Sequence, residues 1–324
     1  ACNFFLVKSQ NNDLQMVLIG DVSPDCTPDW ILDLPFSPLA QIYQKNYKKD
    51  LSGWAKLFSD FKDTNKVKVN NYQNTIIQNN RHWSRIEYKN LICIFHHEAF
   101  QNNDPIASHA HDDFLSFVLF HNGEEILIDT GRKDYGSSSK LFTSNSYHST
   151  VTLNDKSAMY QRNKKIYYPE YLKREYFLKC ERKFDKVSFE IEHNGFSLKN
   201  LQKIIHKRKI ILKDKTVDIV DEINGNGKYK INYFYQFSGN DSYFEKSKDD
   251  FVQDQFTLPH IGISFKKIFN EKKIIPNIFY GNKKPRLGWR SLQYGTESKA
   301  ITCLFSLKRS LPIKSKFTIS FTDL

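Results

Sequence analysis

The sequence SHAHDDFLSFVLFHNGEEILID, residues 108–129, contains the features that decide the fold. Two short apolar runs flank Asn122-Gly123, a dipeptide typical of a two-residue type I′ hairpin turn. We therefore predict an antiparallel hairpin whose returning strand brings Asp129 back beside the start of the first strand. On an extended first strand, His109 and His111 are two residues apart, so their imidazoles should lie on one face of the sheet.

A third histidine stands near the start of another alternating segment. The segment from Tyr147 to Leu153 has the period-two pattern of a strand, and His148 lies at its beginning. A carboxylate and two imidazoles gathered at strand ends form a suitable ligand set for zinc or a similar divalent ion. The same residue types also fit ordinary strand ends and turns. The residues alone therefore leave open both a metal or catalytic site and a purely structural role.

From about residue 75 onward, short segments rich in β-branched and aromatic residues recur between Gly and Asn turns, with Leu287 to Tyr294 among them. Strands at this spacing predict a mainly β fold, a large antiparallel β-sandwich. Earlier in the chain, residues 39–47 and 51–61 have apolar residues at helical spacing. We expect a helical or loop segment over residues 1–74 and a β-sandwich domain over residues 75–324.

The charge of the chain favours an anionic partner. Its 48 Lys and Arg residues outnumber 36 Asp and Glu residues, which gives a formal net charge of +12. An acidic polysaccharide fits this balance, and so does a well-solvated Lys-rich surface without such a ligand. The sequence has no RRM, helix-turn-helix or zinc-finger signature and no apolar run of membrane-spanning length. We expect neither nucleic-acid binding nor membrane insertion.

Several motifs together resemble the C-terminal β domain of the heparinase II/III-like polysaccharide lyases. They are HAHDDFLSF (109–117), DTGRKDYG (129–136), YHSTVTLND (147–155) with Gln161, HNGF (193–196) and HKR (206–208). The resemblance covers roughly residues 75–324, and the order of several separate motifs makes it specific. The sequence departs from the family at Ser149, where Asn is usual, and at Asn194, where Asp is usual.

The resemblance implies a supersandwich-like fold and β-elimination on a uronic-acid-containing polysaccharide. His109 matches the family histidine that assists catalysis by polarising the substrate carboxylate. His111, Asp129 and His148 match the family's metal ligands, which usually hold zinc. Gln161 also matches a family position, and we expect it to contact substrate.

Three further residues are expected to contact the substrate on chemical grounds. Arg132 could pair with a uronate carboxylate or a sulfate, and Tyr135 could stack on a sugar ring. An ordinary ion pair is an equally suitable role for Arg132. Arg162 lies in a polar and aromatic loop after the His148 segment and could line the same face.

The family's catalytic tyrosine belongs to a preceding helical (α/α) toroid domain. We expect residues 1–74 to be a remnant of that toroid or a linker from it, so the tyrosine would come from an N-terminal toroid domain or from a homo-oligomer partner. The alternative is a non-catalytic carbohydrate-binding or scaffolding β module that is inactive without a toroid. The resemblance also implies a bacterial protein that is periplasmic or secreted.

Overall fold

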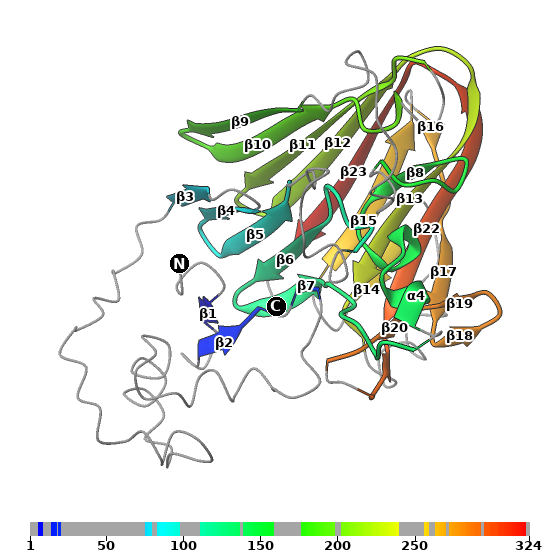
Figure 1. Cartoon of the computed structure of the whole chain (residues 1–324). Helices are drawn as coiled ribbons and strands as arrows, with labels where there is room; N and C mark the ends of the chain where they lie inside the picture. Colours follow the sequence, from blue (N-terminus) through cyan, green and yellow to red (C-terminus); the bar gives the residue numbers. More distant parts are fainter. Residues whose placement is uncertain are drawn as a thin grey trace, which may run out of the picture.

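The structure is a computed structural model that describes residues 6–8, 14–17, 19–20, 75–79, 83–97, 111–136, 139–158, 176–197, 202–239, 256–258, 263–269, 272–292 and 295–321. Two large antiparallel sheets dominate it (Figure 1). No helix in the described part of the chain is long and apolar enough to span a membrane. The predicted mainly β fold is confirmed.

The first sheet, here named the β13 sheet, has the order β17-β22-β13-β7-β6-β5-β4-β3, with β8 also paired to β13. Its strands are β3 (Thr75–Asn79), β4 (Trp83–Tyr88), β5 (Leu91–His96), β6 (Phe117–His121), β7 (Glu124–Leu127), β8 (Val151–Leu153), β13 (Lys228–Phe237), β17 (Asn277–Tyr280) and β22 (Ile301–Ser310). It contains the predicted hairpin as β6 and β7. Asn122 and Gly123 have φ values of 51° and 80°, as a type I′ turn requires.

The second sheet, here named the β12 sheet, has the order β14-β15-β23-β12-β11-β10-β9, with β16 paired to β15. Its strands are β9 (Tyr176–Lys183), β10 (Lys186–His193), β11 (Ile205–Lys213), β12 (Thr216–Asn224), β14 (Phe256–Leu258), β15 (Ile263–Phe269), β16 (Lys272–Lys273) and β23 (Ile313–Phe321). Side chains on β11 alternate between buried and half-buried, so one face of this sheet is turned toward the core.

Aromatic side chains from both sheets fill the space between them. Phe95 of β5 lies 4.4 Å from Phe189 of β10, measured between ring centroids, and Tyr235 of β13 stacks on Phe317 of β23 at 3.9 Å. All four side chains are at most 1% exposed. Burial of apolar area of this kind is the main stabilising contribution to a sandwich, and here it joins the two sheets into one core.

A small hairpin from the start of the chain covers the outer face of the β13 sheet. It consists of β1 (Leu6–Lys8) and β2 (Leu14–Met16), and Val7 and Val17 pack on Ile94, Val118 and Phe120. The described part of residues 1–74 is therefore β structure. The helices predicted over 39–47 and 51–61 lie outside the described residues.

Short elements extend the end of the sandwich near β7. They are α4 (Ser139–Phe142), η3 (Asn145–Tyr147), β18 (Asn282–Lys283), β19 (Arg286–Leu287), β20 (Trp289–Arg290) and β21 (Ser298–Lys299). The single strand predicted over Leu287 to Tyr294 is wrong. Gly288 has φ +77° and breaks it, so β19 and β20 belong to different two-stranded sheets.

Candidate metal centre

Asp129 is placed by the chain that leaves β7. Its Oδ1 atom accepts backbone N–H groups from Gly131 at 2.8 Å and from Gly20 at 3.2 Å. Gly131 has φ +67°, and an added Cβ there would collide with the carbonyl oxygen of Ser291, so only glycine fits this turn. Because backbone groups occupy Oδ1, the other oxygen, Oδ2, is the one that faces the neighbouring histidine.

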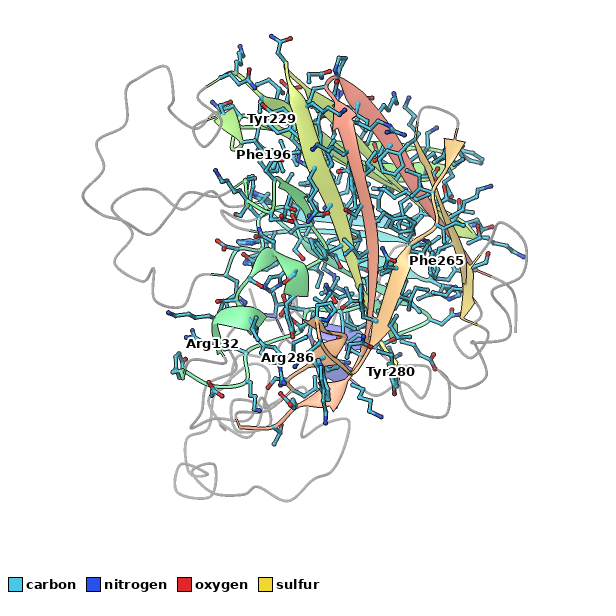
Figure 2. All side chains as sticks on the ribbon, turned by 90° about the vertical axis from the view of Figure 1, so that its right-hand side faces the viewer. Arg132, Phe196, Tyr229, Phe265, Tyr280 and Arg286 are labelled. Carbon is cyan, nitrogen blue, oxygen red and sulfur yellow. The ribbon has the colours of Figure 1, made fainter. Side chains whose placement is uncertain are left out.

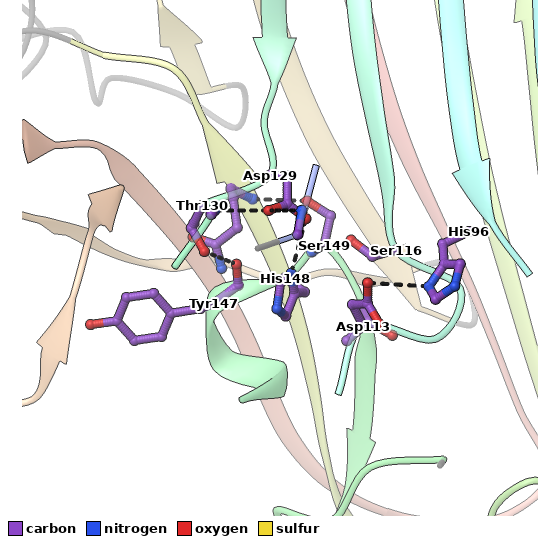
Figure 3. A network of polar contacts seen from close by, with 12 residues as sticks. His96, Asp113, Ser116, Asp129, Thr130, Tyr147, His148 and Ser149 are labelled. Atoms are coloured by element: carbon purple, nitrogen blue, oxygen red, sulfur yellow. Dashed lines mark hydrogen bonds and ion pairs between the residues drawn. The ribbon is translucent and has the colours of Figure 1, made fainter. Parts of the chain in front are cut away.

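That histidine is His148, which lies between η3 and β8. Its Nδ1 atom is 3.3 Å from Asp129 Oδ2, and the side chain is fully buried (Figure 3). The adjacent backbone is held in place because Thr130 Oγ1 donates to the Tyr147 carbonyl at 2.8 Å and Ser149 Oγ accepts the Gln236 N–H at 3.1 Å. His148 itself is extended, with φ −126° and ψ 154°, but it precedes the regular strand by three residues. The predicted strand is therefore present, but it begins at Val151 and not at His148, so the prediction of its start is wrong.

The loop before β6 supplies a second carboxylate that the sequence reasoning did not select. Atoms of Asp113, Asp129 and His148 lie within 4.8 Å of one another, and all three residues are buried. Asp113 Oδ2 also lies 3.2 Å from Nδ1 of His96, at the end of β5. The signal was available, because Asp113 follows His111 by two residues just as His111 follows His109.

The predicted ligand His111 lies beside this cluster. Its ring centroid is 5.1 Å from that of His148, and its side chain is buried. The segment is not the extended strand that was expected, because Ser116 N–H donates to the Asp113 carbonyl in a turn and Leu115 has φ +61°. Here the structure brings together three predicted residues, Asp129, His148 and His111.

Opposite charges hold the cluster together. Burial raises the pKa of Asp113, but the charge of His96 and its hydrogen bond outweigh burial, so the pKa lies below its ordinary value. For Asp129, burial is outweighed in the same way by His148, and the pKa is lowered. Burial lowers the pKa of His148, whereas Asp129 and Asp113 raise it, and the net change is upward. The two carboxylates therefore favour a positive charge at this point.

The donor set fits a divalent cation. His148 Nε2 and Asp113 Oδ1 are buried atoms without a hydrogen-bond partner among the described residues. Buried polar atoms nearly always have a partner, so a missing one needs an explanation such as an ion. Carboxylate oxygens and imidazole nitrogens are ligands that zinc and similar ions accept. This Asp113, Asp129 and His148 group could hold a metal ion.

Of the residues predicted to contact substrate, two are described. The Arg132 guanidinium lies over the ring of Tyr135, 4.0 Å from its centroid, in the loop that follows Asp129. Lys133, the next residue in this loop, pairs with Glu297 at 3.1 Å, and Arg286 of β19 pairs with the same carboxylate at 2.6 Å. Glu297 thus joins the loop to β19. Figure 2 shows Arg132 and Arg286 at the same end of the molecule. The catalytic candidate His109 and the substrate candidates Gln161 and Arg162 lie outside the described residues.

Comparison with known proteins identifies the domain. A family model described as heparinase II/III-like, C-terminal, matches residues 80–266, whereas no curated protein matches the chain. Among solved structures, the heparinase III BT4657 gene product has a TM-score of 0.60 at 14% identity over 98% of this chain and 44% of that one. Heparan sulfate lyase HepC from Pedobacter heparinus has a TM-score of 0.58 at 13% identity, over 98% and 45%. The chain thus spans less than half the length of these structures. On the extent of the family match, the chain belongs to the heparinase II/III-like family, of which it contains the C-terminal domain.

Proposed function

We propose that this chain supplies the metal-bearing β domain of a β-eliminative lyase that acts on an acidic, uronic-acid-containing polysaccharide. The observation that carries the proposal is the buried cluster of Asp113, Asp129 and His148 inside a heparinase II/III-like C-terminal domain. A structural neighbour is a heparan sulfate lyase by name, which supports an acidic glycan as the substrate class.

The metal in this proposal is zinc, held by His111, Asp129 and His148, with Asp113 as an additional carboxylate. When bound, zinc would neutralise the buried carboxylates and cross-link the loop before β6 to the segments after β7 and η3. Ligating histidines and carboxylates usually have their orientation fixed by further hydrogen bonds. Here His96 would orient Asp113 and two backbone N–H groups would orient Asp129.

The proposed reaction needs a base that removes the proton at C5 of the uronate, a group that stabilises the developing charge on its carboxylate, and an acid for the leaving glycosidic oxygen. His109 is proposed for the second role. The base would be a tyrosine from an N-terminal toroid domain or from a second copy of the chain. A periplasmic or secreted location in a bacterium is part of the proposal.

The loop after Asp129 is the proposed glycan-contacting surface. Arg132 stacked on Tyr135 presents a cation and an aromatic ring together, and Tyr135 is 43% exposed. A guanidinium can pair with a uronate carboxylate or sulfate in two parallel hydrogen bonds. Gln161 and Arg162 are proposed to add contacts. The net charge of +12 supports attraction of a polyanion to this surface.

The test measures retention of heparan sulfate and alginate by the chain, and cleavage of both polymers by the chain combined with a supplied toroid domain. Arg132→Ala should weaken retention of the substrate polymer about 10-fold at about 0.1 M salt, and His109→Ala should abolish formation of unsaturated, ultraviolet-absorbing ends. Arg309→Ala is the matched control, because Arg309 pairs with Tyr229 at the opposite end of the sandwich (Figure 2). Its effect on retention should be less than about twofold, since a remote charge is screened beyond about 10 Å at 0.1 M salt.

Each outcome separates the candidate functions. Cleavage that depends on His109 supports the lyase proposal. Retention without cleavage, even when a toroid domain is supplied, favours the carbohydrate-binding module instead. Neither retention nor cleavage of any acidic glycan would overturn both.

A further inference from the structure

A chain of buried polar side chains runs across the β12 sheet. Gly195 N–H donates to His193 Nδ1 at 3.0 Å, His193 Nε2 lies 3.0 Å from His206 Nδ1, and His206 Nε2 lies 2.9 Å from Asp221 Oδ1. Arg208 binds the same carboxylate with Nε at 2.6 Å and Nη2 at 3.2 Å. All four side chains are at most 3% exposed. The set of His193, His206, Asp221 and Arg208 is here named the buried relay.

The hydrogen bonds determine which nitrogen donates and which accepts at each step of the buried relay. Because His193 Nδ1 accepts the Gly195 N–H, its proton is on Nε2 and is donated to His206 Nδ1. The proton of His206 is then on Nε2 and is donated to Asp221. Burial raises the pKa of Asp221, but Arg208 and His206 outweigh it and hold the pKa well below its usual range. His206 and Arg208 therefore both bind Asp221 and orient it, and His193 in turn orients His206.

The remaining nitrogen of the Arg208 guanidinium, Nη1, binds backbone next to the candidate metal centre. It donates to the carbonyl of Leu115 at 2.8 Å and to that of Ser149 at 3.0 Å. Leu115 lies two residues after Asp113, and Ser149 directly follows His148. Arg208 therefore contacts both backbone segments that bring ligands from the loop before β6 and from the end of η3.

Other contacts also fix the conformation of these two backbone segments and join them to each other. Leu115 has φ +61°, a conformation that costs a buried leucine energy unless its surroundings enforce it. Ser149 N–H donates to Ser116 Oγ at 3.0 Å, and Thr150 Oγ1 donates to the Phe114 carbonyl at 2.7 Å. The guanidinium is the one contact among these that ties both segments to the opposite sheet.

We propose that Arg208, oriented by Asp221 and the two relay histidines, is a positioning residue that sets the spacing between the Asp113 and His148 segments and thereby the metal affinity of the site. The inference rests on the proposed metal centre. An arginine is needed because its planar fork binds both oxygens of Asp221 while Nη1 still reaches two carbonyls, and a lysine ammonium cannot make this set of contacts.

The experiment compares zinc affinity in Arg208→Met, Arg208→Lys and wild type by competition with a chromophoric chelator. Loss of an outer partner of a metal site typically lowers affinity about 10- to 100-fold, and we expect a loss in this range for Arg208→Met and a partial recovery in Arg208→Lys. The control is Ile219→Ala on β12, a buried apolar truncation two residues from Asp221 that should lower thermal stability but change zinc affinity less than about twofold.

A second variant keeps the test decisive if Arg208→Met does not fold. Thr150→Val removes the hydroxyl that joins the segments without changing side-chain volume greatly, and it should weaken zinc about three- to tenfold. Hydrogen exchange in residues 111–118 and 145–152 should accelerate in the Arg208 and Thr150 variants but not in Ile219→Ala.

The outcomes distinguish the inference from the proposal beneath it. If wild type binds zinc and Arg208→Met, or Thr150→Val in its place, loses no more affinity than Ile219→Ala, the positioning role is overturned and the metal centre stands. If wild type binds no zinc in chelator-free buffer, both are overturned.

Discussion

Lys267 on β15 offers a test of the electrostatics of the core, since its ammonium lies among aromatic rings. The residue is 1% exposed, and Nζ donates to Tyr235 Oη at 2.8 Å and lies 3.8 Å from the ring centroid of Tyr233. Burial lowers the pKa of Lys267 and the charge of Arg208 lowers it further, whereas Asp221 raises it. The result is a pKa of about 7.

The direction in which stability changes with pH follows from the pKa of Lys267 in the folded and in the unfolded state. The unfolded chain holds this proton up to pH about 10.5 and the folded chain only up to about 7, so between these values the unfolded state binds more protons and stability rises with pH. At 1.36 kcal/mol per pKa unit, the fall from 10.5 to about 7 corresponds to about 5 kcal/mol. Attraction between the ammonium and the aromatic rings returns up to about 2 kcal/mol, which leaves a cost of about 3–5 kcal/mol below pH 7.

The perturbation is Lys267→Met, which removes the buried charge and fills most of its volume. It also leaves Tyr235 Oη without its donor, at a cost of about 1–3 kcal/mol. We therefore expect the variant to be more stable than wild type by about 2 kcal/mol at pH 6 and less stable by about 1–3 kcal/mol at pH 10.5. Urea unfolding at both pH values measures this difference.

Ile219→Ala is the control for this series, because neither isoleucine nor alanine titrates and its destabilisation should be the same at both pH values within about 1 kcal/mol. If the difference between Lys267→Met and wild type is equally independent of pH, Lys267 is not a buried charge whose pKa falls on folding, and the reasoning fails.

Three further predictions concern the metal centre and its surroundings. Gly131→Ala should destabilise the fold by about 2–4 kcal/mol in thermal unfolding, because φ is +67° and the added Cβ meets the Ser291 carbonyl oxygen. The control Gly295→Ala should cost about 1 kcal/mol, because φ is +77° there but no atom lies within 4 Å of the added Cβ. Equal costs would contradict the close packing at Gly131. Asp113→Asn should weaken zinc at least about 10-fold by calorimetry, and Asp112→Asn, outside the cluster, should not; similar losses would remove Asp113 from the site. Chelation should lower Tm in wild type, since a ligand that binds only the folded state at 100 times its Kd contributes about 2.7 kcal/mol, and an unchanged Tm would argue against a bound metal.

The fold was predictable from local patterns. Two short apolar runs on β6 and β7, with Asn122-Gly123 between them, predict a hairpin that the structure contains with the expected turn. The alternation of apolar and polar residues is a local property of the sequence, so it predicts where strands lie but not which strands pair in a sheet. The many predicted strands indicated a large sandwich, but the pairing of β13 with both β22 and β8 joins residues far apart in the sequence, and no local pattern indicated it.

The details of the site depend on contacts that no local pattern contains. The segment from His111 to Ser116 was expected to be extended, but Leu115 adopts φ +61° and its carbonyl is bound by Arg208, 93 residues later. The two-residue spacing from His111 could have marked Asp113 as a candidate, but its position beside Asp129 comes from that turn and not from an extended strand. The HKR motif was noticed in the sequence, yet its connection to the metal centre became visible only in three dimensions.

Metal content and coordination together test the central claim most directly. Zinc would be measured by mass spectrometry and by X-ray absorption in wild type, Asp129→Ala and His111→Ala, with Arg309→Ala as a folded control. We predict about one zinc per chain in wild type and control, with nitrogen and oxygen ligands at about 2.0–2.2 Å, and loss of the metal in Asp129→Ala and His111→Ala. Wild type without stoichiometric zinc, or zinc that remains in Asp129→Ala, would contradict the metal centre.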